Sequence, residues 1–209
     1  MFGIVFYCLE RYKKVFEYYI CMKIILASQS SSRKKALDLL GLEYEIVPSN
    51  IDEKAIREDD PYKLARMLSE AKARGVGEKQ ENSIIVAGDL IATVNGKLFE
   101  KPKDKKDAFE MLKMFSGNEM NILGGLAVYN SKTKKMLSYV GKCTVKFRGL
   151  TGPEIKDYIS RHPVLKFGAA LDDDGLLRFI EHLEGEYVIR TAFPMNKLIP
   201  FLRENGVKV

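Results

Sequence analysis

The sequence contains few of the residues that build histidine- or cysteine-based sites. Its 209 residues include two histidines, His162 and His182, which are far apart in the chain, and no tryptophan. The three cysteines (Cys8, Cys21 and Cys143) have no paired or metal-like spacing. A histidine-rich metal site and a histidine-based catalytic triad are therefore disfavoured. Cysteines spaced in this way indicate a reducing compartment, so we expect a cytoplasmic protein.

The sequence also lacks a hydrophobic run long enough to span a bilayer, so no membrane partner is expected. The apolar stretch that opens the chain is interrupted from Arg11 onwards, without a basic region before it or a small-residue cleavage site after it. Residues 1–21 are expected to be an N-terminal extension ahead of a single domain, 22–209. An amphipathic helix would suit their apolar spacing, and a start codon assigned too far upstream would explain them equally well.

Cations are plentiful but not concentrated. Lysine and arginine number 34 against 28 acidic residues, giving a net charge of +6 in a chain that is 46% apolar and 30% charged. This composition is typical of a globular protein. The excess of positive charge suits either nucleic acid or a polyanionic small substrate such as a triphosphate. Because the basic residues form no dense run, the second is favoured.

Strand-like and helix-like patterns alternate along the chain. We predict strands near residues 23–26, 44–47, 83–94, 98–99, 121–129 and 135–147. Helices are predicted to begin after the serines at 28–32, at Pro61, near Asp104, at Thr151 and at Pro194. Hairpin turns are predicted at 95–96 and 130–131. Because hairpins and crossovers are interleaved, the pattern predicts a mixed α/β (α+β) fold, with a mixed sheet flanked by helices.

The stretch 23–34 combines an apolar strand, a hydroxyl-rich turn and a helix whose first turn carries two cations. Any of its four serines could cap the helix. A helix N-terminus attracts anions, so Ser28 and Ser30 with Arg33 and Lys34 would form a phosphate cradle without a glycine-rich loop. The alternative is a capped surface helix with solvated cations.

Asp89 is the clearest candidate for a catalytic group. It lies within an apolar strand, where a carboxylate is costly to bury unless it is paired or binds metal. An inward aspartate satisfied by the backbone or by a lysine is the alternative. Glu53, in the acidic turn 51–53, and the lysines Lys72 and Lys101 would each be interpreted as solvated if taken alone. Residues 172–174 are three adjacent aspartates that could bind a divalent cation, or be solvated.

Taken in order, these residues resemble the Maf family of nucleoside triphosphate pyrophosphatases, relatives of the inosine triphosphate pyrophosphatases in fold. Residues 28–34 match the family's Ser-x-Ser-x-x-Arg-Arg signature, with Lys34 in place of the second arginine. The family's Ile-Asp-Glu, Lys-Ala, Ala-Asp-Thr and Gly-Lys-Pro motifs are matched by residues 51–53, 72–73, 87–90 and 100–102. Residues 179–185 and 193–194 resemble its closing segment, so the similarity covers 22–206.

The resemblance implies a twisted mixed sheet with two lobes around a cleft. It also implies hydrolysis of a nucleoside triphosphate between the α and β phosphates. The implied substrates are modified nucleotides, which the enzyme would remove from the nucleotide pool, or dTTP and UTP. The catalytic residues that it implies are Asp89, Glu53, Lys72 and Lys101, with Glu53 and Asp89 holding Mg²⁺ or Mn²⁺. The substrate-binding residues that it implies are Ser28, Ser30, Arg33, Lys34, Lys72, Lys101 and Asp173. The resemblance also implies that the protein forms a homodimer.

Two positions depart from the family pattern. Leu90 stands where the family has threonine, and Asp173 stands where it has a glutamine thought to recognise the substrate. An ionised carboxylate can only accept hydrogen bonds, so the base preference does not transfer directly. Inosine or xanthosine triphosphate as substrate stays open.

The rival hypothesis is a non-enzymatic protein that binds nucleic acid or a cell-division partner. Such a protein needs cations but no carboxylates facing them. Glu53 and Asp89 among the candidate phosphate-binding cations therefore favour the enzyme.

Overall fold

The computed structural model describes residues 22–172, 177–190 and 193–209, so the predicted N-terminal helix and Asp173 lie outside the described residues. Its strands are β1 Lys23–Leu26, β2 Glu45–Ile46, β3 Ser83–Val94, β4 Lys97–Phe99, β5 Glu119–Asn130, β6 Met136–Phe147 and β7 Ile180–Gly185. Its α-helices are α2 Ser31–Leu39, α3 Pro61–Gly77, α4 Lys105–Phe115, α5 Gly152–Arg161 and α7 Met195–Glu204. Short 3₁₀ turns lie at Glu53–Ala55, Val164–Lys166, Gly168–Ala170 and Tyr187–Arg190.

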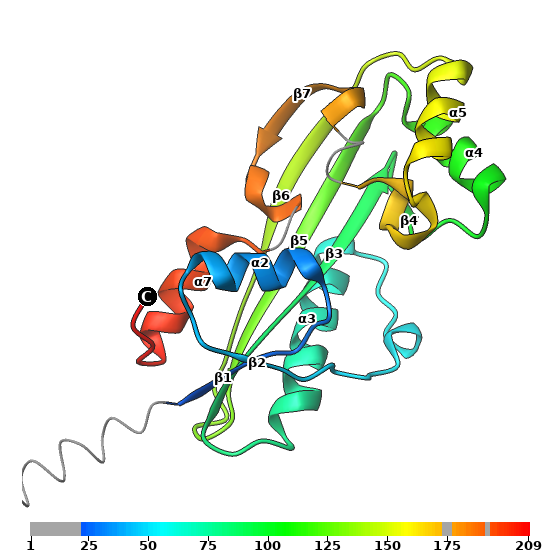
Figure 1. Cartoon of the computed structure of the whole chain (residues 1–209). Coiled ribbons are helices and arrows are strands. Elements are labelled where there is room, and N and C mark those ends of the chain that lie inside the picture. The colour runs from blue at the N-terminus through cyan, green and yellow to red at the C-terminus, as the bar shows by residue number, and fades with distance from the viewer. Residues whose placement is uncertain (1–21, 173–176, 191–192) are drawn as a thin grey trace, which may run out of the picture.

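The strands form one seven-stranded mixed sheet in the order β2-β1-β3-β5-β6-β7, with β4 paired to β3 (Figure 1). β1 runs parallel to β2 and β3, whereas the β3–β5, β5–β6 and β6–β7 pairs are antiparallel. The prediction of a mixed sheet flanked by helices is therefore confirmed. None of the helices in the described ranges combines the length and the apolar character needed to cross a bilayer.

The long central strands carry two layers of helix. Alternate residues of a strand point to opposite faces of the sheet. Val86 packs in a core with Leu198 of α7, whereas Ala87 packs in another with Ala73 of α3. Asp89 has the same parity as Ala87, so its side chain points toward α3. Strand alternation thus decides which helix meets the candidate catalytic carboxylate.

A further core lies at the other end of the long strands. There α4 and α5 lie together, away from α2, α3 and α7 (Figure 1). Its largest buried side chains include Phe115, Phe147, Tyr158 and Phe179. The hydrophobic interior is therefore divided along the sheet, as the expected two-lobed arrangement requires.

The predicted starts of α3 and α5 are confirmed by their local chemistry. Asp60 caps α3 ahead of Pro61, and Thr151 begins α5 in a capping box with Glu154. Gly41 follows α2 with a φ of +66°, and its N–H bonds back to the carbonyl of Asp38. A left-handed backbone conformation directly after a helix is usually adopted by glycine, because glycine has no Cβ that would clash.

Three local predictions need correction. No serine side chain caps α2, although Ser30 occupies the N-cap position. The strand predicted at 44–47 forms ladder pairs only at Glu45–Ile46, next to the short β1. β7 was not predicted as a strand, because its sequence Ile-Glu-His-Leu-Glu-Gly at 180–185 is largely polar and mostly exposed.

Candidate active site

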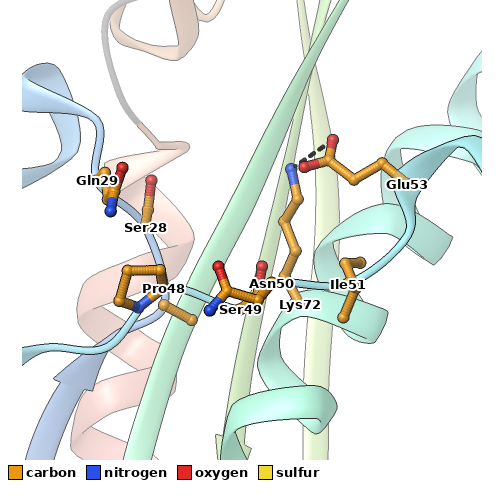
Figure 2. A pocket seen from close by; sticks show the side chains of 9 residues that line it. Ser28, Gln29, Pro48, Ser49, Asn50, Ile51, Glu53 and Lys72 are labelled. Atoms are coloured by element: carbon orange, nitrogen blue, oxygen red, sulfur yellow. Dashed lines mark ion pairs between the residues drawn. The ribbon is translucent and has the colours of Figure 1, made fainter.

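The candidate site lies where the loops after β1 and β2 meet α3 and β3. A cleft of about 320 Å³ opens there, lined by Ala27, Ser28, Gln29, Pro48, Ser49, Asn50, Ile51, Glu53 and Lys72. Figure 2 shows these side chains and the ion pair between Lys72 and Glu53. β1 ends at Leu26, so the cleft opens at the carboxyl end of a parallel strand. This is the usual place for a ligand in an open α/β sheet.

Lys72 is the centre of the site. Its Nζ lies 2.5 Å from Asp89 Oδ1 and 3.0 Å from Glu53 Oε2. The Lys72 side chain is 10% exposed and that of Asp89 is 15% exposed, whereas Glu53 is half exposed. A lysine is rarely so deeply buried unless its charge is paired. The interpretation of Lys72 as a solvated surface lysine is therefore wrong, and Asp89 is an inward aspartate paired with a lysine.

The sequence of α3 contains the signal for this burial. Its buried positions include Ala65, Ser69 and Ala73, at the spacing of one helix face. Lys72 lies on that face, one turn after Ser69, in a position where an apolar residue would normally pack. By contrast, Met67 of the same helix is 41% exposed, although its side chain is apolar.

Arg33 brings a second cation to the site from α2. Its Nη1 donates to Ser28 Oγ at 3.2 Å, and the Ser30 backbone N–H donates to the same oxygen at 3.2 Å. Burial lowers the pKa of the Arg33 guanidinium, and the charges of Asp89 and Glu53 oppose that shift. The pKa of an arginine starts so high that it stays protonated.

Arg33 keeps unused hydrogen-bonding capacity. Its Nε is buried and has no hydrogen-bond partner in the described part of the chain. The guanidinium carbon lies 5.8 Å from the centre of the Phe193 ring, within the range of a cation–π contact. A buried donor of this kind is costly to leave unpaired, so it favours an incoming acceptor such as a phosphate oxygen.

The other predicted site residues are less closely joined. Lys34 lies on α2, and its backbone carbonyl accepts a hydrogen bond from Tyr44 Oη. Lys101 is exposed just before the buried Pro102, and no contact within the described residues joins it to Lys72. Asp173 lies outside the described residues, and its neighbour Asp172 contacts His162 Nδ1 at 2.8 Å. The structure thus brings together Ser28, Arg33, Glu53, Lys72 and Asp89.

Comparison with known proteins identifies the family. A model of the family described as Maf-like protein matches residues 23–205. The chain belongs to the Maf-like family. Two relatives, both named dTTP/UTP pyrophosphatase, come from Clostridium botulinum (strain Loch Maree / Type A3) and Carboxydothermus hydrogenoformans. The first is 37% identical over 191 residues, covering 89% of this chain and 98% of the relative. The second is 37% identical over 187 residues, covering 88% and 100%.

A third relative of this Maf-like protein, a dTTP/UTP pyrophosphatase from Thermosipho africanus, is 36% identical over 189 residues, covering 89% of the chain and 95% of the relative. Among solved structures, a nucleoside-triphosphatase (dITP/XTP pyrophosphatase) from Mycobacterium abscessus is 16% identical. The match covers 66% of this chain and 94% of the chain in that structure, with a TM-score of 0.40.

The Maf-like site contains two carboxylates that suit a hard divalent cation. Glu53 and Asp89 both lie within hydrogen-bond reach of the Lys72 ammonium, so they converge on one point. Among the described residues, no three or more histidine, cysteine, aspartate or glutamate side chains are grouped so that they could hold a metal ion by themselves. Mg²⁺ is commonly held by one or two carboxylates together with substrate phosphates and water. The two carboxylates therefore fit a cation that is completed by its substrate.

Sequence reasoning did not single out Phe193 as a functional residue. It is fully buried, and its ring lies against Gly88, whose added Cβ would be 2.9 Å from it. The same ring lies within cation–π range of Arg33, so one aromatic residue contacts both the strand of Asp89 and the cationic side chain. Its only signal in the sequence was its place in residues 193–194, which resemble the closing segment of the family.

We expect Phe193→Leu to raise the KM for the nucleoside triphosphate about 3- to 10-fold, with a smaller change in kcat. The reason is that the cation–π contact that orients Arg33 is lost. Phe147→Leu is the matched control, since Phe147 is equally buried in the distant core. Steady-state kinetics at equal folded fraction would measure both variants. If Phe147→Leu raises KM as much as Phe193→Leu, the effect reflects general core damage.

Proposed function

We propose that this Maf-like protein hydrolyses a nucleoside triphosphate at the α–β bond, releasing nucleoside monophosphate and pyrophosphate, with dTTP and UTP as its main substrates. The observation that carries the proposal is the buried Lys72 ammonium between Asp89 and Glu53, with Arg33 near both carboxylates. The relatives' shared name supports the substrate class. House-cleaning of modified nucleotides would use the same chemistry.

The residues divide the chemistry between positioning and charge neutralisation. Lys72 and Arg33 bind phosphate oxygens, and Ser28 keeps the guanidinium in place. Asp89 accepts the proton of the attacking water, because it is the carboxylate most shielded from solvent at this point. Glu53 and Asp89 would hold Mg²⁺, which supplies neutralisation of the developing phosphate charge when it is bound.

The remaining expectations belong to the same proposal. We place Lys34, Lys101 and Ser30 at the edge of the triphosphate site, and Asp173 near the base. Residues 22–209 would form the catalytic unit, in the cytoplasm and with a homodimer as its assembly. The nucleic-acid-binding alternative is disfavoured because two carboxylates face the cations of the cleft.

The test is a panel of ordinary and modified nucleoside triphosphates with Mg²⁺ or Mn²⁺, in which pyrophosphate and orthophosphate are measured separately. We expect pyrophosphate from UTP and dTTP, with little orthophosphate and with no release when the metal is chelated. Salt-sensitive binding to DNA or RNA without turnover of any nucleotide would contradict the proposal and support the binding protein. Preferential turnover of inosine or xanthosine triphosphate would correct its substrate.

A further inference from the structure

We propose that Gln29, Ser49 and Asn50 form the subsite for the pyrophosphate group that leaves during hydrolysis. The inference rests on the proposed function, because it assigns a part of that substrate to one end of the cleft. The three side chains come from the loops after β1 and β2, and all line the cleft. In the view of Figure 2, Ser49 and Asn50 lie between Gln29 and Lys72.

The chemistry of these side chains suits an anion with many acceptor oxygens. A hydroxyl and two carboxamides can each donate to phosphate, and none of them adds a negative charge. Within the described residues, none of the three side chains is engaged in a hydrogen bond or ion pair. Lys72 supplies the positive charge at the same cleft. The lining therefore offers unused neutral donors beside the Lys72 ammonium, which is also paired with Glu53 at the same cleft.

A nucleobase fits this end of the cleft less well. The cleft lining contains no aromatic ring on which a base could stack, and its apolar part is limited to Ala27, Pro48 and Ile51. The proposed proton acceptor, Asp89, contacts Lys72 but does not line this part of the cleft. In an in-line displacement the leaving group departs on the side opposite the attacking water. The pyrophosphate group would therefore extend past Lys72 toward Asn50.

The loop that carries Ser49 and Asn50 packs against α3. Asn50 has a φ of +47°, a left-handed conformation that asparagine tolerates better than most residues. A Cβ added at Gly75 of α3 would lie 2.9 Å from Ile51 Cγ2, so the loop packs directly on the helix. Gly75 is one turn from Lys72 on that helix. Ser49, Asn50 and Lys72 are therefore all supported by α3.

The test compares Asn50→Gly and Asn50→Asp with the same changes at Asn82. Asn82 has a φ of +46° and lies outside the cleft lining, so glycine is equally acceptable to the backbone at both positions. Affinity for inorganic pyrophosphate with Mg²⁺ is measured by calorimetry and by inhibition of turnover. We expect a loss of about 10-fold for Asn50→Gly and about 100-fold for Asn50→Asp, whose added charge repels the anion.

The controls separate the subsite from general damage and from the proposed function. UMP affinity should change by less than about 2-fold in both Asn50 variants, and both Asn82 variants should behave as the wild type. Unchanged pyrophosphate affinity in Asn50→Gly and Asn50→Asp would overturn the inference. An altered ratio of kcat/KM for UTP over CTP with unchanged pyrophosphate affinity would place the base there instead. If the wild type turns over no nucleotide, the proposed function fails. Calorimetry would still measure whether the Asn50 variants bind pyrophosphate more weakly than the wild type.

Discussion

Replacing Asp89 by asparagine is expected to lower kcat by about 10³-fold or more while leaving the protein folded. Asparagine has nearly the same shape but cannot accept a proton from water, and it removes one of the two carboxylates proposed to hold Mg²⁺. Lys72 keeps Glu53 as an ionic partner at 3.0 Å, so its charge is not left alone in the site. Pyrophosphate release and the urea unfolding midpoint would be measured together.

Asp59→Asn is the matched control for the change in charge. Asp59 is exposed ahead of α3, and its replacement should change kcat by less than about 2-fold. A fully active Asp89→Asn protein would contradict the assignment of Asp89 as the catalytic carboxylate. If Asp89→Asn is inactive and also unfolded, Glu53→Gln is the second test, since Glu53 is half exposed and its loss should reduce activity without disturbing the core.

Gly125→Ala is expected to destabilise the fold by about 3 kcal/mol, at the upper end of overpacking costs. Gly125 pairs with Asp89 across the β3–β5 ladder and faces α3. An added Cβ would lie 2.3 Å from both the Ala65 carbonyl oxygen and Ser69 Oγ, which are already hydrogen-bonded to each other. Either α3 or the strand must move, because both partners are buried and neither can swing away.

The displacement of α3 should also affect the active site, since Lys72 is on the same helix. We expect Gly125→Ala to lower kcat/KM about 10-fold in the protein that remains folded. Gly149→Ala is the control, because no atom lies within 4 Å of a Cβ at that position. Urea unfolding and steady-state kinetics would measure both. Equal free energies of unfolding for the two variants would contradict the close packing of α3 on β5.

Much of the secondary structure could be predicted because its signals are local. The bounds of β3 are those of the predicted strand, 83–94, since the run is largely apolar and the turn Asn95–Gly96 ends it. The capping box of α5 and the proline at the start of α3 are likewise contained in a few adjacent residues. β7 was not predicted because its residues are largely polar and because, in the described part of the chain, it pairs with β6 alone at the edge of the sheet.

The candidate site was predictable only in part. Asp89 was apparent because a charged residue interrupts an apolar strand, and the serines and cations of 28–34 were apparent as a phosphate cradle at a helix N-terminus. The family resemblance was needed for Glu53, Lys72 and Lys101, which would be interpreted as solvated if taken alone. The role of Lys72 as the link between the two carboxylates was not apparent from its position on a helix. Asn50 carried no signal beyond being a turn residue. Phe193 was noted only as part of the segment that resembles the family's closing motif, without a role at the site.

The sequence by itself determined the periodicity of each element, the polar interruptions and the family to which the chain belongs. The tertiary structure decided which face of the sheet α3 covers, and so which cation meets Asp89. Strand alternation places Asp89 toward α3, and Gly125, without a side chain, lets that helix come close enough for Lys72 to reach the carboxylate. Ionic contacts depend on distances between atoms that are far apart in the chain. Only the packing of helix on sheet sets those distances.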